Sequence, residues 1–127
     1  MKGALVLVLC AAVLLPGAAA AETRSFLVFF FTGSTVITPQ GETTIGQFVR
    51  VCGPSGFDAV VHGHTDTAES SDALAQARGD AVRDRMIALG FPATRISVVS
   101  HGAKSLLVPT APNTPEPQNR RVEQVCH

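Results

Sequence analysis

The sequence lacks an excess of charge of either sign. Its 127 residues carry ten Lys and Arg against ten Asp and Glu. Binding to nucleic acid or to a general anionic membrane surface requires a concentrated basic surface. We therefore expect neither of these partners.

Catalytic signatures are also missing. The serines are not in a nucleophile turn such as G-x-S-x-G, and the aspartates do not form an evident acid and base pair. We therefore expect a protein that is not an enzyme. The residues considered were Ser34, Ser70, Ser71 and Ser100 for the nucleophile, and Asp58, Asp66 and Asp72 for the acid and base.

No apolar run is long enough for a membrane-spanning helix. The run from Ala4 to Leu15 is shorter than the roughly 20 residues that a spanning helix needs. It follows Lys2 and precedes a Pro-Gly break and small residues with A-x-A spacing, which is typical of a cleaved secretory signal peptide. We therefore expect a signal peptide at 1–21 and a single exported domain at 22–127, with no internal repeat.

Cysteine is scarce, with three residues in the chain. Cys10 lies in the predicted signal peptide, so Cys52 and Cys126 remain as an even pair in an oxidising compartment. This count predicts a disulfide between them, although pairing across two chains stays open. A bridge that closes so long a loop could contribute a few kcal/mol to stability.

The chain alternates between strand-like and helix-like segments. This order predicts an α+β, two-layer βαβαββ domain, in which two helices cover a mixed four-stranded sheet. The run 25–31 is apolar and rich in aromatic residues, so both faces of the strand would be apolar. Such a strand is expected inside the sheet. A proline-rich segment at 102–118 predicts a long ordered loop. The strands are expected at 25–31, 57–63, 96–100 and 120–125, and the helices at 39–52 and 72–89.

Apolar residues at helical spacing define one buried stripe on each helix. Thr38 before Pro39 marks the start of the first helix, and Ser71 or Asp72 marks the start of the second. The expected stripes are Ile45, Phe48, Val49 and Cys52 on the first helix, and Leu74, Ala77, Ala81, Val82 and Leu89 on the second.

Three charged residues stand out against this pattern. Arg78 shares the apolar face of the second helix or its edge, where a guanidinium needs a partner. Asp66 lies on the turn that leads into the same helix, and Arg120 begins the last strand. One interpretation is an internal Asp66–Arg78 salt bridge. The other is a pocket for a zwitterionic ligand, whose ammonium binds the carboxylate and whose carboxylate binds the guanidinium.

Three motifs in order, GHTD at 63–66, LAQAR at 74–78 and NRRVE at 119–123, resemble the OmpA-like peptidoglycan-binding family. The resemblance covers nearly all of the exported chain. It implies non-covalent, non-catalytic binding to the diaminopimelate residue of the peptidoglycan stem peptide, without a cofactor. By this resemblance Asp66 binds the ammonium and Arg78 the carboxylate, while Thr65 and Arg120 match further pocket positions.

The resemblance also implies a place in the cell envelope. Family members tether envelope components to the cell wall and carry a barrel, lipid or membrane-helix anchor. The chain after cleavage is expected to have none of these. We therefore expect a periplasmic module, with an envelope protein that supplies the anchor as a further partner and outer-membrane association as an option.

The sequence departs from the family pattern at three places. Phe31 stands where the family usually has an aspartate, and the turn after Asp66 is about three residues short, with Ser71 nearest the usual asparagine. Ala75 and Gly79 replace the usual serine and alanine beside the arginine. These departures favour an alternative, in which a diverged domain keeps the fold and acts as a protein-interaction or structural module without wall binding.

Two further interpretations concern the histidines and Arg121. His62, His64 and Asp66 alternate along a strand and could project from one face as metal ligands, with His101 completing the cluster. We nonetheless expect that the chain binds no metal. Arg121 is expected on the face opposite Arg120 and in a salt bridge, and Glu123 is the natural partner for it or for a helix arginine.

Overall fold

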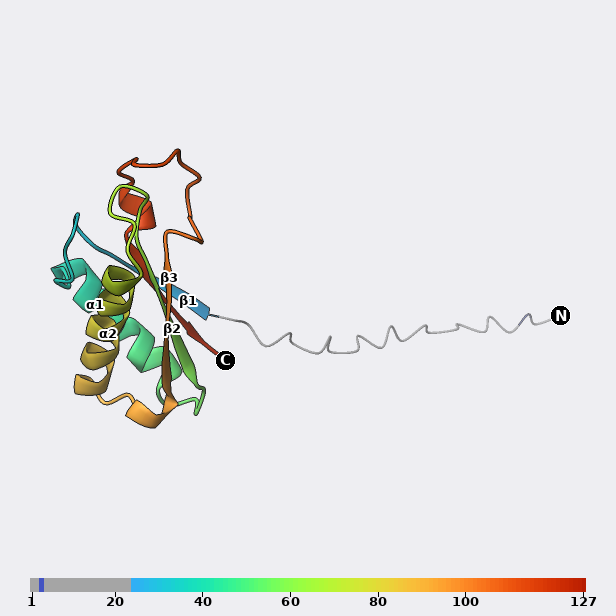
Figure 1. Ribbon diagram of the computed structural model, residues 1–127. Helices are drawn as coiled ribbons and strands as arrows, with labels where there is room; N and C mark the ends of the chain where they lie inside the picture. The colour runs from blue at the N-terminus through green and yellow to red at the C-terminus, as the bar shows by residue number, and fades with distance from the viewer. Residues whose placement is uncertain (1–2, 4–23) are drawn as a thin grey trace.

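The computed structural model describes Gly3 and residues 24–127, so Cys10 and the rest of the predicted signal peptide apart from Gly3 lie outside the described residues. Residues 24–127 form two layers, with both helices on one face of a four-stranded sheet (Figure 1). The predicted α+β, βαβαββ fold is confirmed. The elements are β1 (Arg24–Phe29), α1 (Pro39–Cys52), β2 (Ala59–His64), α2 (Asp72–Ala88), η1 (Ala93–Arg95), β3 (Ile96–Gly102), η2 (Pro117–Asn119) and β4 (Arg121–Cys126).

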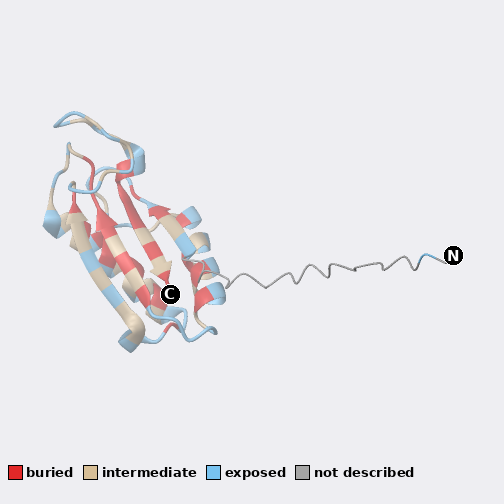
Figure 2. Ribbon diagram, turned by 90° about the vertical axis from the view of Figure 1, so that its right-hand side faces the viewer, coloured by how far each residue is buried: buried red, intermediate tan, exposed pale blue. Residues whose placement is uncertain are grey.

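The sheet has the strand order β1-β4-β2-β3, in which β2 and β3 are parallel and the other neighbours are antiparallel. β1 is therefore an edge strand, and the prediction that the run 25–31 lies inside the sheet is wrong. Val28 and Phe30 are buried beneath the helices, whereas Phe29 is exposed and Phe31 is 71% exposed. An uninterrupted apolar run does not show how many of its faces are covered. Figure 2 shows the alternation of buried and less buried residues along the strands.

Both helices begin where the capping residues predict. The Thr38 hydroxyl accepts a hydrogen bond from the Gly41 N–H, and Pro39 occupies the first helical position. The Ser71 hydroxyl accepts from the Leu74 N–H at the start of α2. Each hydroxyl satisfies a backbone donor that has no partner within the helix.

The buried face of α1 is as predicted, but the buried face of α2 is not. Of the predicted α2 stripe only Val82 is fully buried, whereas Ala77 and Leu89 are exposed. A hydrophobicity pattern misses this face because its central residues are an arginine and a glycine. The buried residues are Gly41, Ile45, Phe48 and Cys52 on α1, and Ala75, Arg78, Gly79, Val82 and Met86 on α2.

Two glycines let α2 approach the sheet closely. A Cβ atom on Gly63 of β2 would lie 2.0 Å from the carbonyl oxygen of Ala75. A Cβ atom on Gly79 would lie 2.6 Å from Cγ1 of Val98 on β3. Because glycine has no Cβ atom, the backbone of α2 can lie directly against β2 and β3. Arg78 therefore lies beside the end of β2, where it binds the carbonyl of His64.

The core lies between the helices and the sheet and includes the predicted disulfide. Cys52 at the end of α1 is bonded to Cys126 at the end of β4, with Cα atoms 6.2 Å apart. The prediction of this disulfide is confirmed. No helix within residues 24–127 combines the length and the apolar character needed to cross a membrane.

The loops that follow β1, β2 and β3 gather at one end of the sheet (Figure 1). The loop after β3 is long, as predicted, and two side chains tie it down. Asn119 accepts from the N–H groups of Leu107 and Val108 at 2.8 Å each. The hydroxyl of Thr67, in the loop after β2, donates to the carbonyl of Ala111 at 2.8 Å. The three loops therefore form one ordered surface at this end.

Candidate functional site

The sequence-predicted site residues all lie at this end of the sheet and are all buried. Thr65 and Asp66 follow β2 directly and are each 1% exposed, Arg78 on α2 is 0% exposed and Arg120 before β4 is 8% exposed. Buried charged groups need partners because their desolvation is costly. Their hydrogen bonds therefore decide what the site can bind.

Asp66 fixes the loop after β2 and joins it to the loop before β4. Its Oδ1 accepts hydrogen bonds from the N–H groups of Ala68 at 3.0 Å and Glu69 at 2.9 Å. Its Oδ2 accepts from the Glu116 N–H at 3.1 Å and from Nη1 of Arg120 at 3.0 Å. The carboxylate thus has two donors on each oxygen.

These contacts favour the ionised form of Asp66. Burial alone raises the pKa of its carboxyl group, but the backbone N–H groups of Glu69 and Glu116 and the guanidinium of Arg120 outweigh this effect. The pKa of Asp66 is therefore held below its usual value of 3.8. At neutral pH the site contains a fixed negative charge.

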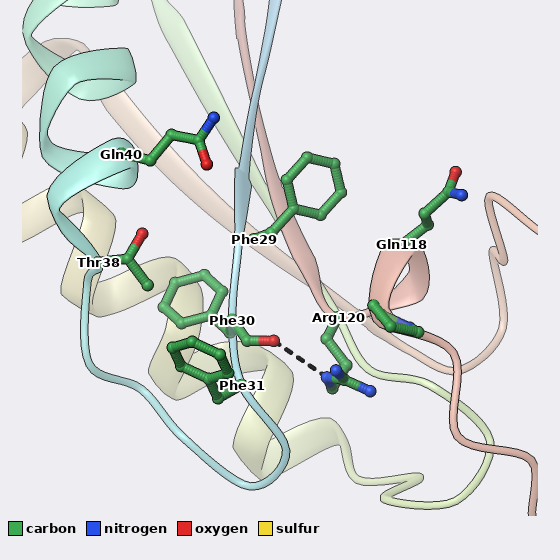
Figure 3. A pocket seen from close by; sticks show the side chains of 8 residues that line it. Phe29, Phe30, Phe31, Thr38, Gln40, Gln118 and Arg120 are labelled. Atoms are coloured by element: carbon green, nitrogen blue, oxygen red, sulfur yellow. Dashed lines mark hydrogen bonds between the residues drawn. The ribbon is translucent and has the colours of Figure 1, made fainter.

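Arg120 connects this buried charge to a surface pocket. Its Nε donates to the carbonyl of Phe30 at 3.0 Å and its Nη1 to Asp66, whereas Nη2 has no hydrogen-bond partner among the described residues. The pocket has a volume of about 300 Å³ and lies beside the end of β1. In Figure 3 the guanidinium lies between Phe30 and Phe31, which follow β1, and the η2 turn. The lining residues are Phe29, Phe30, Phe31, Thr38, Gln40, Pro117, Gln118 and Arg120.

Arg78 is saturated. A guanidinium has five N–H donors. Nε donates to the carbonyl of Ser34 at 2.9 Å, and Nη1 and Nη2 donate to the carbonyls of His64 at 3.2 Å and Phe31 at 3.1 Å. The remaining two donors bind the carboxylate of Glu69 in a bidentate pair, with Nη2 to Oε1 at 3.0 Å and Nη1 to Oε2. All five donors therefore have acceptors.

The structure thus contains two ion pairs in place of the one predicted. The interpretation of an internal Asp66–Arg78 salt bridge is wrong, because Asp66 binds Arg120 and Glu69 binds Arg78. The side chain of Asp66 accepts from N–H groups of its own turn, which turns it away from α2. Sequence reasoning missed Glu69. The available signal was an acidic residue inside the shortened turn that leads to a helix with a buried arginine.

Thr65 directly follows the last residue of β2. Its N–H donates to the carbonyl of Gly102 at 2.8 Å, which joins the ends of β2 and β3. Its hydroxyl is buried and has no hydrogen-bond partner among the described residues. Of the four predicted site residues, Arg120 is the one that lines the pocket beside β1.

The predicted histidine cluster forms without Asp66. Nδ1 of His62 lies 2.8 Å from Nε2 of His101, and the rings of His64 and His101 stack at 4.8 Å. Asp66 instead forms an ion pair with Arg120. Within the described part of the chain, no group of three His, Cys, Asp or Glu residues could hold a metal ion. The alternative metal-ligand set is therefore wrong.

Burial shapes the titration of these histidines. It is the main cause that lowers the pKa of His64 to about 3, and Arg121 and the neighbouring rings of His101 and His62 add to it. The pKa of His62 is also lowered, first by burial and then by His101. His64 is therefore neutral at physiological pH.

Arg121 does not form the predicted salt bridge. Its Nη2 donates to the carbonyl of Ser105 at 3.1 Å, in the loop after β3, and Oε1 of Glu123 instead accepts from the hydroxyl of Ser25 at 2.7 Å. Burial lowers the pKa of Arg121. Arg121 therefore binds a carbonyl of the loop after β3 and not the carboxylate of Glu123.

The fold and the loop arrangement define an OmpA-like domain, and the chain belongs to the OmpA family, whose model matches residues 29–120. An outer membrane protein of Gluconacetobacter diazotrophicus is 30% identical over 114 residues, which cover 82% of this chain and 30% of the relative. The chain thus spans less than a third of that relative.

Solved structures support the same fold. The peptidoglycan-associated lipoprotein of Burkholderia pseudomallei is 25% identical with a TM-score of 0.71, over 80% of this chain and 90% of the other. The cell wall anchor of the type VI secretion system of Pseudomonas aeruginosa is 21% identical with a TM-score of 0.65, over 84% and 82% of the two chains. The second likeness supports the fold alone.

Proposed function

We propose that this chain is a non-catalytic module that binds peptidoglycan through the diaminopimelate of the stem peptide. Family membership supports this function, and so does the similarity to a peptidoglycan-associated lipoprotein. The observation that carries the proposal is the gathering of Asp66, Arg78 and Arg120 at one loop-lined end of the sheet. Diaminopimelate presents an ammonium and a carboxylate on one carbon, and these three charges suit such a ligand.

Each residue has a role in this proposal. Asp66 receives the ammonium and Arg78 the carboxylate, while Arg120 orients Asp66 through its Nη1 contact and offers Nη2 toward the pocket. Thr65 holds the ends of β2 and β3 together beneath the site. The apolar walls contributed by Phe29 and Phe31 would contact the aliphatic part of the stem residue.

Three of the candidate nucleophilic serines have structural contacts, which supports binding without catalysis. The Ser34 hydroxyl accepts from the Val36 N–H at 3.0 Å, the Ser71 hydroxyl caps α2, and the Ser100 hydroxyl donates to the carbonyl of Asp72 at 2.8 Å. The proposed location is the periplasm after export, with an envelope protein as the partner that provides an anchor.

The saturation of the charges favours a second candidate function. Arg78 has no spare donor, and Asp66 already accepts four hydrogen bonds. A domain with these groups fully paired could have kept the fold and become a protein-interaction module of the envelope.

The two candidate functions predict different results in a sedimentation experiment with two kinds of cell wall. Diaminopimelate differs from lysine by one side-chain carboxylate, so walls with lysine at this position are a matched control. We expect the purified protein to sediment with insoluble diaminopimelate-type peptidoglycan, to stay in solution with lysine-type peptidoglycan, and to release no soluble fragments. A folded protein that stays in solution with both walls would favour the interaction module, and fragment release would contradict a non-catalytic role.

A further inference from the structure

The bidentate pair between Glu69 and Arg78 occupies the place where a ligand carboxylate would bind. The two outer nitrogens of Arg78 face the two oxygens of Glu69, which is the geometry that a guanidinium adopts with any free carboxylate. Oε1 of Glu69 also accepts from the Gly33 N–H at 2.8 Å. Glu69 is therefore bound by donors from two segments outside its own turn.

The other three contacts of Arg78 do not depend on Glu69. They go to the backbone carbonyls of Phe31, Ser34 and His64, which belong to the loop after β1 and the end of β2. These carbonyls fix the orientation of the guanidinium. If the side chain of Glu69 rotated away, Nη1, Nη2 and the Gly33 N–H would remain as an ordered set of donors for a carboxylate.

The backbone around Glu69 does not depend on the side chain of Glu69. It lies in the turn between β2 and α2, flanked by Ala68 and Ser70, which are both exposed. Its side chain is 8% exposed, whereas that of Arg78 is 0% exposed. The backbone of the turn is held separately by Asp66, which accepts from the N–H groups of Ala68 and Glu69.

We infer that Arg78 and the Gly33 N–H form a carboxylate site that Glu69 fills as an internal ligand, so that an external carboxylate binds only by displacing Glu69. The identity of that external carboxylate, the diaminopimelate of the stem peptide, rests on the proposed function. The apparent affinity for the external carboxylate is the affinity of the open site multiplied by the fraction of molecules in which Glu69 has left the site. If that fraction were about 1%, the affinity would be about 100-fold weaker than that of the open site.

Chemical rescue with acetate tests the site without any peptidoglycan. Glu69→Ala removes the internal carboxylate and leaves two N–H donors of a buried guanidinium unpaired, so its melting temperature should fall. Sodium acetate should then raise the melting temperature of Glu69→Ala well above its value in sodium chloride of equal ionic strength. Wild type should show no such difference between the two salts.

A matched control separates this site from a general effect of acetate. Glu42 forms an ion pair with Arg85 in which both side chains are about 40% exposed. Glu42→Ala should show no rescue by acetate, because water already solvates Arg85. Equal acetate responses in wild type, Glu42→Ala and Glu69→Ala would overturn the inference.

Glu69→Gln keeps the test valid if the alanine variant does not fold. Glutamine preserves the shape of the side chain but has no charge and has one acceptor oxygen, so it should be displaced more readily than glutamate. We expect an acetate response larger than that of wild type. Absence of that response in folded Glu69→Gln would overturn the inference.

Sedimentation with diaminopimelate-type peptidoglycan separates this inference from the proposed function. If both hold, Glu69→Ala should bind the wall about tenfold or more tightly than wild type, because the internal competitor is gone. Acetate rescue without wall binding in either protein would keep the carboxylate site and reject the proposed function. Wall binding by wild type without acetate rescue would keep the function and reject the internal ligand.

Discussion

Oδ2 of Asp66 lies 3.0 Å from Nη1 of Arg120, and this ion pair joins residues that are 54 positions apart in the sequence. The pair connects the loop after β2 to the start of β4 and is almost completely buried. Removing one partner of such a pair leaves an uncompensated buried charge. The arrangement of the three loops therefore depends on both residues.

We predict that Arg120→Ala lowers the free energy of unfolding by about 3–5 kcal/mol, because it leaves the buried Asp66 carboxylate without its guanidinium partner. Urea unfolding followed by circular dichroism measures the change. Arg83→Ala is the control, since Arg83 forms an exposed pair with Asp84 at 3.6 Å. A loss for Arg120→Ala no larger than for Arg83→Ala would contradict the structural role.

The lowered pKa of Asp66 predicts a loss of stability in acid. Its folded pKa lies below its unfolded value of 3.8, so its contribution is complete above that value and is lost as the pH falls through the folded pKa. Wild type should therefore unfold more readily below about pH 4. The control is Asp66→Asn, which should be less stable at neutral pH and show a shallower decline in acid. Parallel pH profiles for the two proteins would contradict the assignment.

His64 should stay neutral far below the usual histidine pKa. Burial and the nearby Arg121 lower its pKa from 6.5 to about 3, so the folded state binds fewer protons than the unfolded state between these values. The stability that neutral His64 contributes is present above 6.5 and decreases as the pH falls toward about 3. NMR titration of the ring should show no protonation of His64 near pH 5. A midpoint close to 6.5 would be the contrary result.

The close approach of α2 to β2 predicts a strong effect at one glycine. In Gly63→Ala the new Cβ meets the Ala75 carbonyl oxygen at 2.0 Å, and neither backbone can move cheaply. We expect a loss of about 3 kcal/mol or more. Gly46→Ala on α1 is the control, because its nearest atom is a nitrogen of Arg50 at 3.5 Å, and it should stabilise the helix by about 0.5–1 kcal/mol. Thermal unfolding of both variants checks the contrast.

The disulfide should contribute substantially to stability. Cys52 and Cys126 are 74 residues apart, and their bond restricts the unfolded chain over that length. The double variant Cys52→Ala/Cys126→Ala should lose about 2–5 kcal/mol of unfolding free energy. Reductant should lower the melting temperature of wild type but leave that of the double variant unchanged. An equal response of both proteins would show that the bond is not the cause.

The local parts of this fold could be predicted from the sequence because each depends on a few neighbouring residues. The hydroxyls of Thr38 and Ser71 and the ring of Pro39 define the helix starts without reference to the rest of the chain. The position of β1 at the sheet edge could not be predicted. An apolar strand can pair on one side or on both, and the choice depends on strands that follow much later.

The sequence indicated Asp66, Arg78 and Arg120 as charged residues of one site, but it indicated neither Glu69 nor the pairing of these charges. Arg78 stood out because a charge within an apolar face needs an acceptor. Its acceptor was not Asp66, because the turn uses that side chain for its own N–H groups. The folded turn brings the carboxylate of Glu69 to Arg78. The N–H of Gly33, from a segment distant in the sequence, also binds this carboxylate. Hydrophobic periodicity carries no information on such contacts.

We propose that this chain binds peptidoglycan through the charges of Asp66 and Arg78. The most direct test is sedimentation with diaminopimelate-type peptidoglycan in the presence of free diaminopimelate or free lysine, for wild type, Asp66→Asn and Arg78→Lys, each first shown to be folded. We predict that diaminopimelate but not lysine releases wild type from the wall, and that both variants bind at least about tenfold more weakly. Wild-type binding that lysine releases equally well, or that both folded variants retain, would contradict the claim.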